Sequence, residues 1–238
     1  MTDARKMATN VVVGWIANIV KVAVQLVMIP LMARLLGPAE MGLYALTVPI
    51  MSFVFQLADA GLGNSLAREP ADHHRIWSSA FWVLQAMGVV LTLGVAGSGF
   101  VIAALAHQPR LPGVMLALST IFLMVAASVL PTARLTQKGR LAFAPVADMV
   151  GNLLGAGLGV YCALSGYGVW SMVAQYVSAY FFRTVVLNVT EFYLPRFHFD
   201  IEGLKTHVQM GGAITVTRLI DFGGRIIENT QILSLIHI

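Results

Sequence analysis

Polar side chains interrupt an apolar segment near the N-terminus at spacings that place them on one face of a helix. Asn18, Lys21 and Gln25 lie three and four residues apart, within an apolar stretch that extends from about Val11 to Leu36. A charged residue at the centre of a bilayer costs about 2.5–3.5 kcal/mol on insertion scales, so it rarely faces lipid. We expect this stripe to line a water-filled cavity. The alternative is a stripe that only joins helices through hydrogen bonds.

A second polar stripe follows in the next apolar segment. Ser52, Gln56, Asp59 and Gly63 are spaced four, three and four residues apart, and they again share one face. Asp59 is a candidate partner for Lys21, because an ion pair would neutralise both charges inside the membrane. The alternative is that Asp59 lies near the membrane interface, since few residues separate it from the next polar loop.

A third pair of polar residues, Asp148 and Asn152, lies one helical turn apart near the start of a later helix. We expect both to line the same cavity. The same helix carries a ladder of small residues, Gly151, Gly155 and Gly159, which indicates close helix packing rather than chemistry. The following helix has a milder polar face, formed by Ser171, Gln175 and Ser178, for which packing and function are equal alternatives.

The last polar face is the most heavily charged. Arg218, Asp221, Arg225 and Glu228 are spaced three, four and three residues apart. Opposite charges at this spacing pair along a helix, which lowers the cost of placing them in a membrane. We expect these four residues to line the cavity as well. A solvated amphipathic helix is the alternative.

The composition indicates that these residues lie in membrane-spanning elements. The chain is 58% hydrophobic and 11% charged, with a mean hydropathy of +0.78, whereas soluble domains carry about 25% charged residues. Its apolar runs are continuous rather than alternating, which predicts helices and not a β-barrel. We therefore expect an all-α, polytopic membrane protein. The expected helices are 10–35, 41–66, 78–106, 111–133, 144–165 and 167–189, with a seventh that begins near 209.

The positive charges predict the orientation of these helices. With the N-terminus in the cytoplasm, ten Lys and Arg residues fall on the inner side and two on the outer side, as the positive-inside rule requires. The inner set is Arg5, Lys6, Arg68, Arg75, Arg134, Lys138, Arg140, Arg183, Arg196 and Lys205, and the outer set is Arg34 and Arg110. The segment 191–208, with its aromatic and basic residues, is expected to form a partly helical, interfacial elbow on the cytoplasmic side.

The sequence contains no pattern typical of an enzyme. His73 and His74 lie in a short loop without a third metal ligand nearby, and the single Cys162 has no metal-site spacing. There is also no glycine-rich phosphate loop with its lysine. We therefore expect no catalytic residues, no metal and no cofactor. We assign the net charge of +4 to membrane topology and not to nucleic-acid binding.

Several motifs together resemble one family. They are "GWIANIVKVAVQLVMIPLMARLLGPAEMGLYAL", "QLADAGLGNSLAR", "LPTARLTQKGRLAF", "LSGYGVWSMVAQYV" and "FYLPRFHFD". In this order they are similar to the polysaccharide-exporter flippases of the multidrug/oligosaccharidyl-lipid/polysaccharide superfamily. The resemblance extends from about Gly14 to Ile232, and the ordered combination of motifs is more specific than any one of them.

The resemblance implies a domain organisation of two six-helix lobes around a central cavity, in a protein of twelve or fourteen helices. Residues 1–190 would form the first lobe, 191–208 the elbow, and 209–232 the start of the second lobe with helix seven. The final "LSLIHI" at 233–238 reads as the translation of a sequencing-adapter end. We expect the natural sequence to stop near Ile232 and the chain to be a fragment. An ordinary apolar helix end is the alternative.

The resemblance also implies a function. In such flippases a cationic cavity accepts the pyrophosphate and sugars of a polyprenyl-linked oligosaccharide, which would give Lys21 a role, with Arg218 and Arg225 as partners across the lobes. We expect a flippase of the bacterial inner membrane that works by alternating access in the biosynthesis of O-antigen or exopolysaccharide. Expected partners are the lipid-linked oligosaccharide, membrane lipid, and polysaccharide polymerases and glycosyltransferases.

An ion or proton gradient would drive this transport, with Asp59, Asp148 or Glu228 as candidate coupling sites. Two other functions remain open. An ion-coupled multidrug exporter of the same superfamily would be favoured by a cavity dominated by carboxylates and aromatic residues. A membrane-embedded polysaccharide polymerase or acyltransferase would be favoured by a large outer loop or a clustered acid/base pair.

Overall fold

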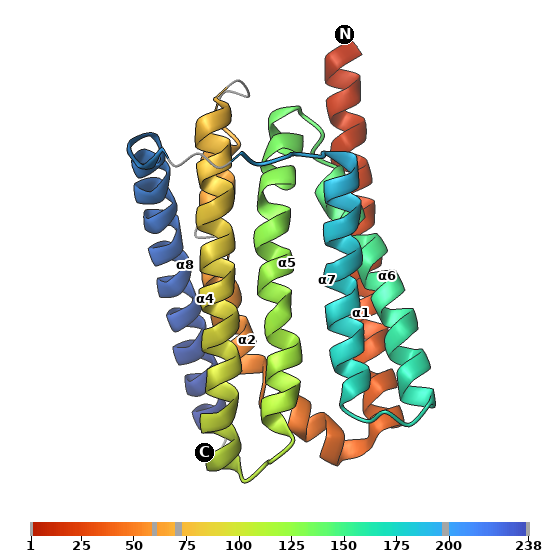
Figure 1. The fold of residues 1–238 in the computed structure, drawn as a ribbon. Helices are drawn as coiled ribbons and strands as arrows, with labels where there is room; N and C mark the ends of the chain where they lie inside the picture. Colours follow the sequence, from red (N-terminus) through yellow and green to blue (C-terminus); the bar gives the residue numbers. More distant parts are fainter. Residues whose placement is uncertain (1, 59–60, 70–72, 197–199, 237–238) are drawn as a thin grey trace.

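Long α-helices account for most of the chain, and they run side by side along one axis (Figure 1). The computed structural model describes residues 2–58, 61–69, 73–196 and 200–236. The helices are α1 (Thr2–Ala45), α2 (Val48–Leu57), α3 (Leu62–Leu66), α4 (His74–Ala106), α5 (Leu111–Gln137), α6 (Phe143–Leu164), α7 (Trp170–Thr190) and α8 (Ile201–Ile236). The described residues form no strand, so the prediction of an all-α fold is confirmed.

These helices have the length and composition of membrane spans. Among the described residues, the segments that could cross a bilayer are Met7–Ala45, His74–Ala106, Leu111–Gln137 and Phe143–Leu164. α7 runs beside α6 (Figure 1), but its polar residues lower its hydropathy and it does not belong to this set. Large apolar side chains are exposed on α1 and α4, among them Trp15 and Phe100. Such surfaces fit lipid, and the chain is a multi-pass membrane protein.

The prediction of one continuous helix over 41–66 is wrong. The chain bends inside α1 at Gly37, where φ is 77° and a residue with a side chain would be strained. α1 then continues to Ala45, and the remainder of the expected helix is divided between α2 and α3. The second apolar segment therefore does not cross the bundle as one continuous helix.

The break between α1 and α2 has a local cause. Pro49, in the first turn of α2, has no N–H to donate to the carbonyl of residue 45, so a continuous helix would lose a hydrogen bond there. At the end of α1, the hydroxyl of Thr47 donates to the carbonyl oxygen of Tyr44 over 2.7 Å. Pro49 in the first turn of α2 and Thr47, which precedes α2, thus account for the position of the break.

The contact between α6 and α7 depends on small residues. A Cβ atom at Gly155 would lie 2.5 Å from the carbonyl oxygen of Gln175, and one at Gly159 would lie 2.7 Å from the Cβ atom of Gln175. A Cβ atom at Gly151 would collide with the carbonyl oxygen of Ala179. The glycine ladder therefore brings the two helix backbones into direct contact, as its spacing predicts.

α8 begins at Ile201, eight residues before the start expected near 209, and it packs against α3. The buried ring of His207 forms the contact. Its Nδ1 atom lies 2.6 Å from Oγ of Ser65, and its Nε2 atom lies 2.9 Å from Oε2 of Glu69. The second half of the expected elbow is thus the first part of a helix that is fixed to the bundle.

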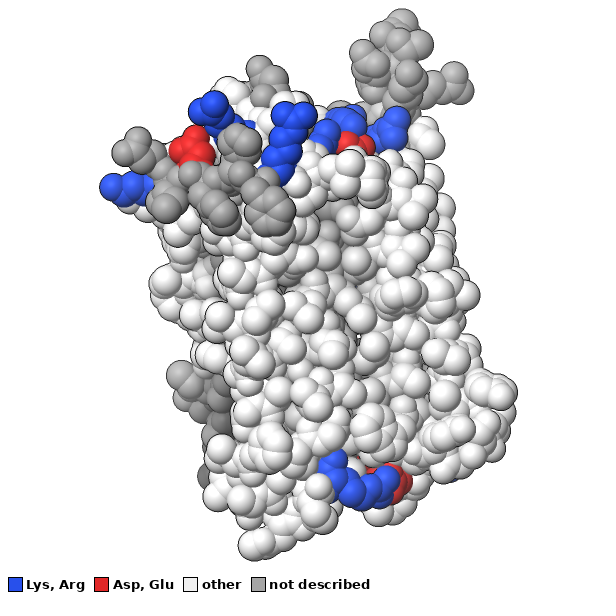
Figure 2. All heavy atoms as spheres, viewed as in Figure 1, with Lys and Arg blue, Asp and Glu red and all other residues white. Residues whose placement is uncertain are grey.

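Charged side chains gather at the two ends of the bundle, with an uncharged band between them on the face in Figure 2. At the end that carries the N-terminus, Glu191 accepts hydrogen bonds from Nζ of Lys138 at 2.6 and 2.7 Å. At the opposite end, Glu40 pairs with Arg110 at 2.7 Å and accepts a hydrogen bond of 2.7 Å from the backbone N–H of Val169. These contacts join the loops at each end, as expected for a bundle whose middle lies in lipid.

Candidate functional site

A cavity of about 270 Å³, which we call the charged chamber, lies between α1, α2, α5, α6 and α7. Its lining residues are Lys21, Gln25, Phe55, Val125, Asp148, Asn152, Tyr176, Ala179, Tyr180 and Arg183. Lys21 and Gln25 come from the polar stripe of α1, and Asp148 and Asn152 come from the polar pair of α6. The structure thus places residues from two of the predicted polar faces around one space.

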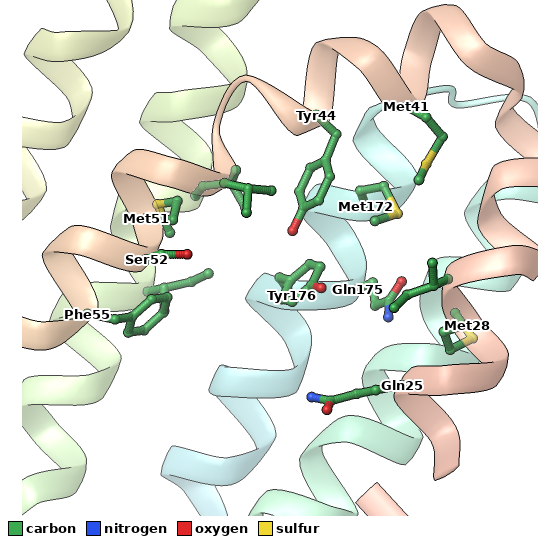
Figure 3. Close-up of a pocket in the computed structure, with 14 residues that line it drawn as sticks. Gln25, Met28, Met41, Tyr44, Met51, Ser52, Phe55, Met172, Gln175 and Tyr176 are labelled. Carbon is green, nitrogen blue, oxygen red and sulfur yellow. The ribbon is translucent and has the colours of Figure 1, made fainter. Parts of the chain in front are cut away.

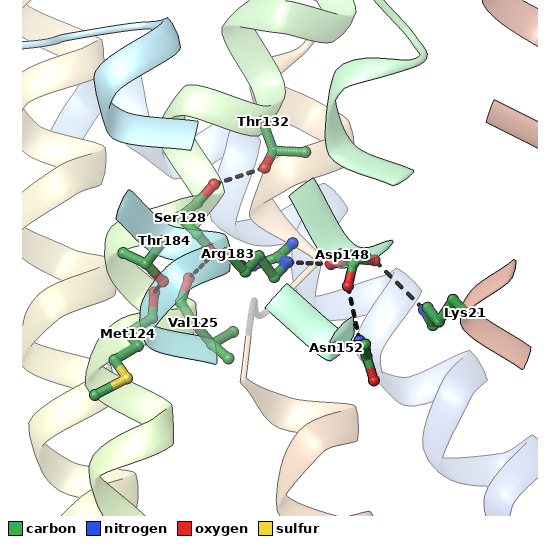
Figure 4. A network of polar contacts seen from close by, with 9 residues as sticks. All are labelled: Lys21, Met124, Val125, Ser128, Thr132, Asp148, Asn152, Arg183 and Thr184. Carbon is green, nitrogen blue, oxygen red and sulfur yellow. Dashed lines mark hydrogen bonds and ion pairs between the residues drawn. The ribbon is translucent and has the colours of Figure 1, made fainter. Parts of the chain in front are cut away.

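The charged chamber is organised around the carboxylate of Asp148 (Figure 4). Nζ of Lys21 lies 3.4 Å from its Oδ2 atom, and Nε of Arg183 donates to its Oδ1 atom. The guanidinium of Arg183 also donates to Oγ of Ser128 on α5. Asn152 donates to the backbone carbonyl oxygen of Asp148 over 2.8 Å. Four helices therefore hold one cluster of polar groups.

The cluster carries an excess of positive charge. One carboxylate is shared by two cations, so Lys21, Asp148 and Arg183 together have a formal charge of +1. Their side chains are 28%, 26% and 19% exposed, so each remains partly accessible from the chamber. Because apolar walls focus the field of a partly buried charge, an anion is the ligand that this chamber favours.

A second cavity, of about 450 Å³, adjoins the first, and we call it the neutral chamber. Gln25, Phe55 and Tyr176 line both chambers, so the two spaces are adjacent. Figure 3 shows Tyr44 and Tyr176 in the middle of the neutral chamber, between Ser52 and Phe55 on one side and Gln175 and Met28 on the other. The remaining lining residues are Ile29, Met41, Val48, Met51, Leu118, Ile121 and Met172. None of the lining residues carries a formal charge.

A third cavity, of about 270 Å³, lies between Arg183 of the cluster and Arg218 of α8. Phe55, Val125 and Arg183 line both this cavity and the charged chamber. Arg218 of α8 lines it as well, and its other polar residues are Asn64, Ser128, Thr132 and Thr136. The basic residue that the sequence predicts for the second lobe therefore lies along the same series of cavities as Lys21.

Other predicted cavity residues lie elsewhere. Asn18 is exposed on α1 and Asp221 is exposed on α8, and neither lines any of the three cavities. Gln56 is half-buried on α2 and is also absent from their walls, where its neighbour Phe55 is found. Asp59 lies outside the described residues. Arg225 and Glu228 belong to α8, but their side chains also lie outside what the structure describes.

Arg183 is the functional candidate that the sequence analysis missed, because its charge was counted with those of the cytoplasmic side. It lies two turns before the end of α7 at Thr190, inside the bundle and beside Asp148. A signal was available in the sequence. Tyr176, Tyr180 and Arg183 are spaced four and three residues apart, and all three line the charged chamber.

In the described part of the chain, no three His, Cys, Asp or Glu side chains converge on a possible metal position. His73 and His207 instead contact the two carboxylate oxygens of Glu69, His207 at 2.9 Å. The residues that line the three cavities offer ion pairs, hydrogen bonds and aromatic faces to a ligand.

The chain is similar to known proteins over most of its length. The model of a family described as polysaccharide biosynthesis protein matches residues 31–233. The succinoglycan biosynthesis transport protein ExoT of Rhizobium meliloti (strain 1021) is 26% identical over 202 residues, which are 84% of this chain and 40% of that protein. The lipopolysaccharide biosynthesis protein WzxC of Escherichia coli (strain K12) is 19% identical over 213 residues, 87% of this chain and 42% of that protein. No solved structure matches. The chain thus spans about two-fifths of the length of these relatives.

Proposed function

Because this chain belongs to the polysaccharide biosynthesis protein family, we propose that it forms one lobe of a flippase for lipid-linked oligosaccharides. The complete protein would move a polyprenyl-diphosphate-linked oligosaccharide across the bacterial inner membrane by alternating access of two lobes. Residues 1–190 would be the first lobe, and α8 would be the first helix of the second. The names of the two relatives, one a transport protein for succinoglycan biosynthesis, support this class of cargo.

The observation that carries the proposal is the cluster around Asp148. A diphosphate needs partners that are cationic and that donate several hydrogen bonds, and Arg183 and Lys21 supply both. The cluster lies within a bundle whose surface faces lipid, where an unrelieved charge is costly. Such charges mark a transport pathway more often than they stabilise a fold, and here they line a chamber.

Energy coupling is part of the same proposal. Of the three predicted coupling carboxylates, Asp148 is the one whose side chain the structure describes, since Asp59 and the side chain of Glu228 lie outside the described residues. The carboxylate of Asp148 binds Lys21 and Arg183, so it competes with the cargo anion for both cations. We assign the coupling role to Asp148 on this basis.

Substitutions of Lys21 test the cargo-binding role in the complete gene product. We expect Lys21→Ala to abolish export while its membrane abundance stays normal, and Lys21→Arg to retain part of the activity because its charge remains. Lys21→Gln should fail like alanine, since an amide replaces the hydrogen bond but not the charge. The matched control is Asn18→Ala, on the same helix face but outside the chambers, which should export normally.

The readouts are surface polysaccharide and membrane abundance in a strain that lacks its own flippase. Full export by Lys21→Ala at normal membrane abundance would show that this residue does not bind the cargo. Full export by Lys21→Gln would show that Lys21 only joins helices.

A multidrug exporter is the second candidate, because the neutral chamber contains methionine and aromatic residues that suit lipophilic cations. The net positive charge of the neighbouring cluster argues against such a cargo. We expect the complete gene product to leave the ethidium sensitivity of an efflux-deficient strain unchanged. Resistance that disappears with Tyr176→Leu would favour the exporter instead.

A further inference from the structure

Another cavity, of about 600 Å³, lies between the start of α4 and the segment that joins α7 to α8, which crosses the bundle at the end that carries the N-terminus (Figure 1). Arg75 and Arg196 line it, together with His73, His74 and Asp200. We call it the basic pocket. It shares no lining residue with the three cavities described above, so cargo binding in those cavities does not account for it.

Buried contacts fix one wall of the basic pocket to the other. The backbone N–H of Arg196 donates to Oγ of Ser78 over 3.2 Å, and its carbonyl oxygen accepts a hydrogen bond of 3.3 Å from Nε1 of Trp82. Oγ of Ser78 also lies 2.8 Å from the hydroxyl of Tyr193, and this serine is 1% exposed. The backbone that carries Arg196 is therefore held against the turn of α4 that carries Arg75.

The basic pocket carries an excess of positive charge. Arg75 and Arg196 are both exposed, and within the described part of the chain neither guanidinium is paired with a carboxylate. Asp200 also lines the pocket, but its Oδ1 atom accepts a hydrogen bond of 2.9 Å from the backbone N–H of Gly203. Two guanidinium groups in one cavity repel each other, and an anion between them would relieve this repulsion. The fork of donors on arginine matches the oxygen atoms of a phosphate.

The face of α4 that carries Arg75 continues into the lipid-facing part of the helix. Trp82, Val89 and Phe100 follow at intervals of seven, seven and eleven residues, which are close to whole numbers of helical turns. Val89 is 46% exposed and Phe100 is 68% exposed. Tryptophan is typical of the membrane interface, where one end of its ring is apolar and the other is wet. A basic group, a tryptophan and an apolar stripe thus follow one another in the order of the phosphate, glycerol and acyl chains of a phospholipid.

We propose that the basic pocket binds the phosphate of an anionic phospholipid, such as phosphatidylglycerol, whose acyl chains lie along the exposed face of α4. The inference goes beyond the proposed function, because this lipid belongs to the surrounding membrane and is not the cargo. Basic pockets at the ends of membrane helices bind such headgroups. Phe192 and Leu194, on the same segment as Arg196, are 71% and 72% exposed, as expected for side chains that enter the membrane interface.

Anisotropy of a phosphatidylglycerol that is fluorescently labelled on one acyl chain tests this proposal with the complete gene product, purified in a neutral detergent. Phosphatidylcholine with the same label is the matched probe, since it has the phosphate but no net charge. We expect the Kd of phosphatidylglycerol to be lower by fivefold or more. Arg75→Ala and Arg196→Ala should each raise it about fivefold, because each removes one charge from the pocket, and should leave the Kd of phosphatidylcholine unchanged. Arg75→Lys keeps the charge and should lose less affinity than Arg75→Ala.

Arg68→Ala is the control, because it removes an exposed positive charge from the turn after α3, outside the basic pocket. It should change neither Kd. A loss equal to that of Arg75→Ala would show that the charge of the whole surface attracts the lipid, and it would overturn the pocket. Equal Kd values for the two lipids on the wild-type protein would overturn it as well. Inorganic phosphate at matched ionic strength should leave phosphatidylglycerol bound, and displacement by millimolar phosphate would mean that a soluble phosphate is the ligand instead.

Discussion

The Nζ atom of Lys21 lies 3.4 Å from the Oδ2 atom of Asp148, so the charge that interrupts the first apolar segment has its partner on α6. The sequence analysis proposed Asp59 as a candidate partner of Lys21, and Asp59 lies outside the residues that the structure describes. The pair with Asp148 does not neutralise Lys21 completely, because Arg183 shares the same carboxylate. The arrangement therefore lowers the cost of two partly buried cations and still leaves the chamber positive.

Removal of the shared carboxylate should destabilise the lobe. In Asp148→Asn, Lys21 and Arg183 lose their counter-ion and repel each other. Breaking a fully buried pair costs about 3–5 kcal/mol, and because these groups are about one-quarter exposed we expect a loss of about 1–3 kcal/mol. Thermal unfolding of the purified protein in detergent measures this loss of stability as a lower Tm. Asp221→Asn, at an exposed position on α8, is the control, and an equal Tm for both variants would contradict the prediction.

Close packing of α6 on α7 should make Gly155 intolerant of even one methyl group. The new Cβ atom in Gly155→Ala would lie 2.5 Å from a backbone oxygen, so the helices must separate. We expect a loss of about 1–3 kcal/mol, seen as a lower Tm and lower membrane abundance. Gly157→Ala changes the same helix at a position with no neighbouring atom within 4 Å, and it should be neutral or slightly stabilising. Equal tolerance of both changes would refute this account of the contact.

Glu40 should contribute more to stability than its partner Arg110. Glu40→Ala leaves the backbone N–H of the buried Val169 without its acceptor, which costs about 1–3 kcal/mol. Arg110→Ala removes only an ion pair whose arginine is 53% exposed, which is worth about 0–1 kcal/mol. Thermal unfolding of both variants in low and high salt separates the contribution of the hydrogen bond to Val169 from that of the ion pair with Arg110. The loss in Glu40→Ala should persist in high salt, and a loss that disappears there would mean that only the ion pair matters.

The loops at the two ends of the bundle should lie on opposite sides of the membrane. Gln108 and Gly166 follow α4 and α6 at the end away from the N-terminus, and Lys138 follows α5 at the other end. The bias of positive charge predicts that the end with the N-terminus is cytoplasmic. Reporter fusions at Gln108 and Gly166 should therefore behave as external, and a fusion at Lys138 as internal. The reverse pattern would overturn the orientation.

The sequence predicted most of the long helices, because uninterrupted apolar runs between short polar loops leave few other assignments. It did not predict the division of 41–66. Hydropathy does not register that Pro49 lacks an N–H, and a proline inside an apolar run is compatible with both a kinked helix and two helices. The start of α8 at Ile201 was not predicted, since the mixed residues of 191–208 indicated an interfacial elbow that is only partly helical, and His207 is buried through its contacts with Ser65 and Glu69.

For the site, helical spacing identified residues that share one face of a helix. It did not show which other helix packs against that face. Lys21 and Asn18 share a stripe, yet Lys21 lines the charged chamber and Asn18 is exposed. Which of them turns inward depends on how α1 packs on α6, and this is a property of the whole bundle. Arg183 was counted with the charges of the cytoplasmic side, because a basic residue near a helix end is usually at the interface. Its spacing from Tyr176 and Tyr180 places the three on one helix face, and the structure shows that this face meets Asp148 on the neighbouring helix.

The glycine ladder affects how the charged cluster would behave during a transport cycle. With no layer of side chains between α6 and α7, neither helix can slide along the other without a collision of backbone atoms. In the proposed transport cycle, Asp148 and Arg183, one on each helix, would therefore keep their separation while the lobe rocks. Their part of the electrostatic potential would belong to one helix pair. It would move with that pair, and the compartment to which it is exposed would change.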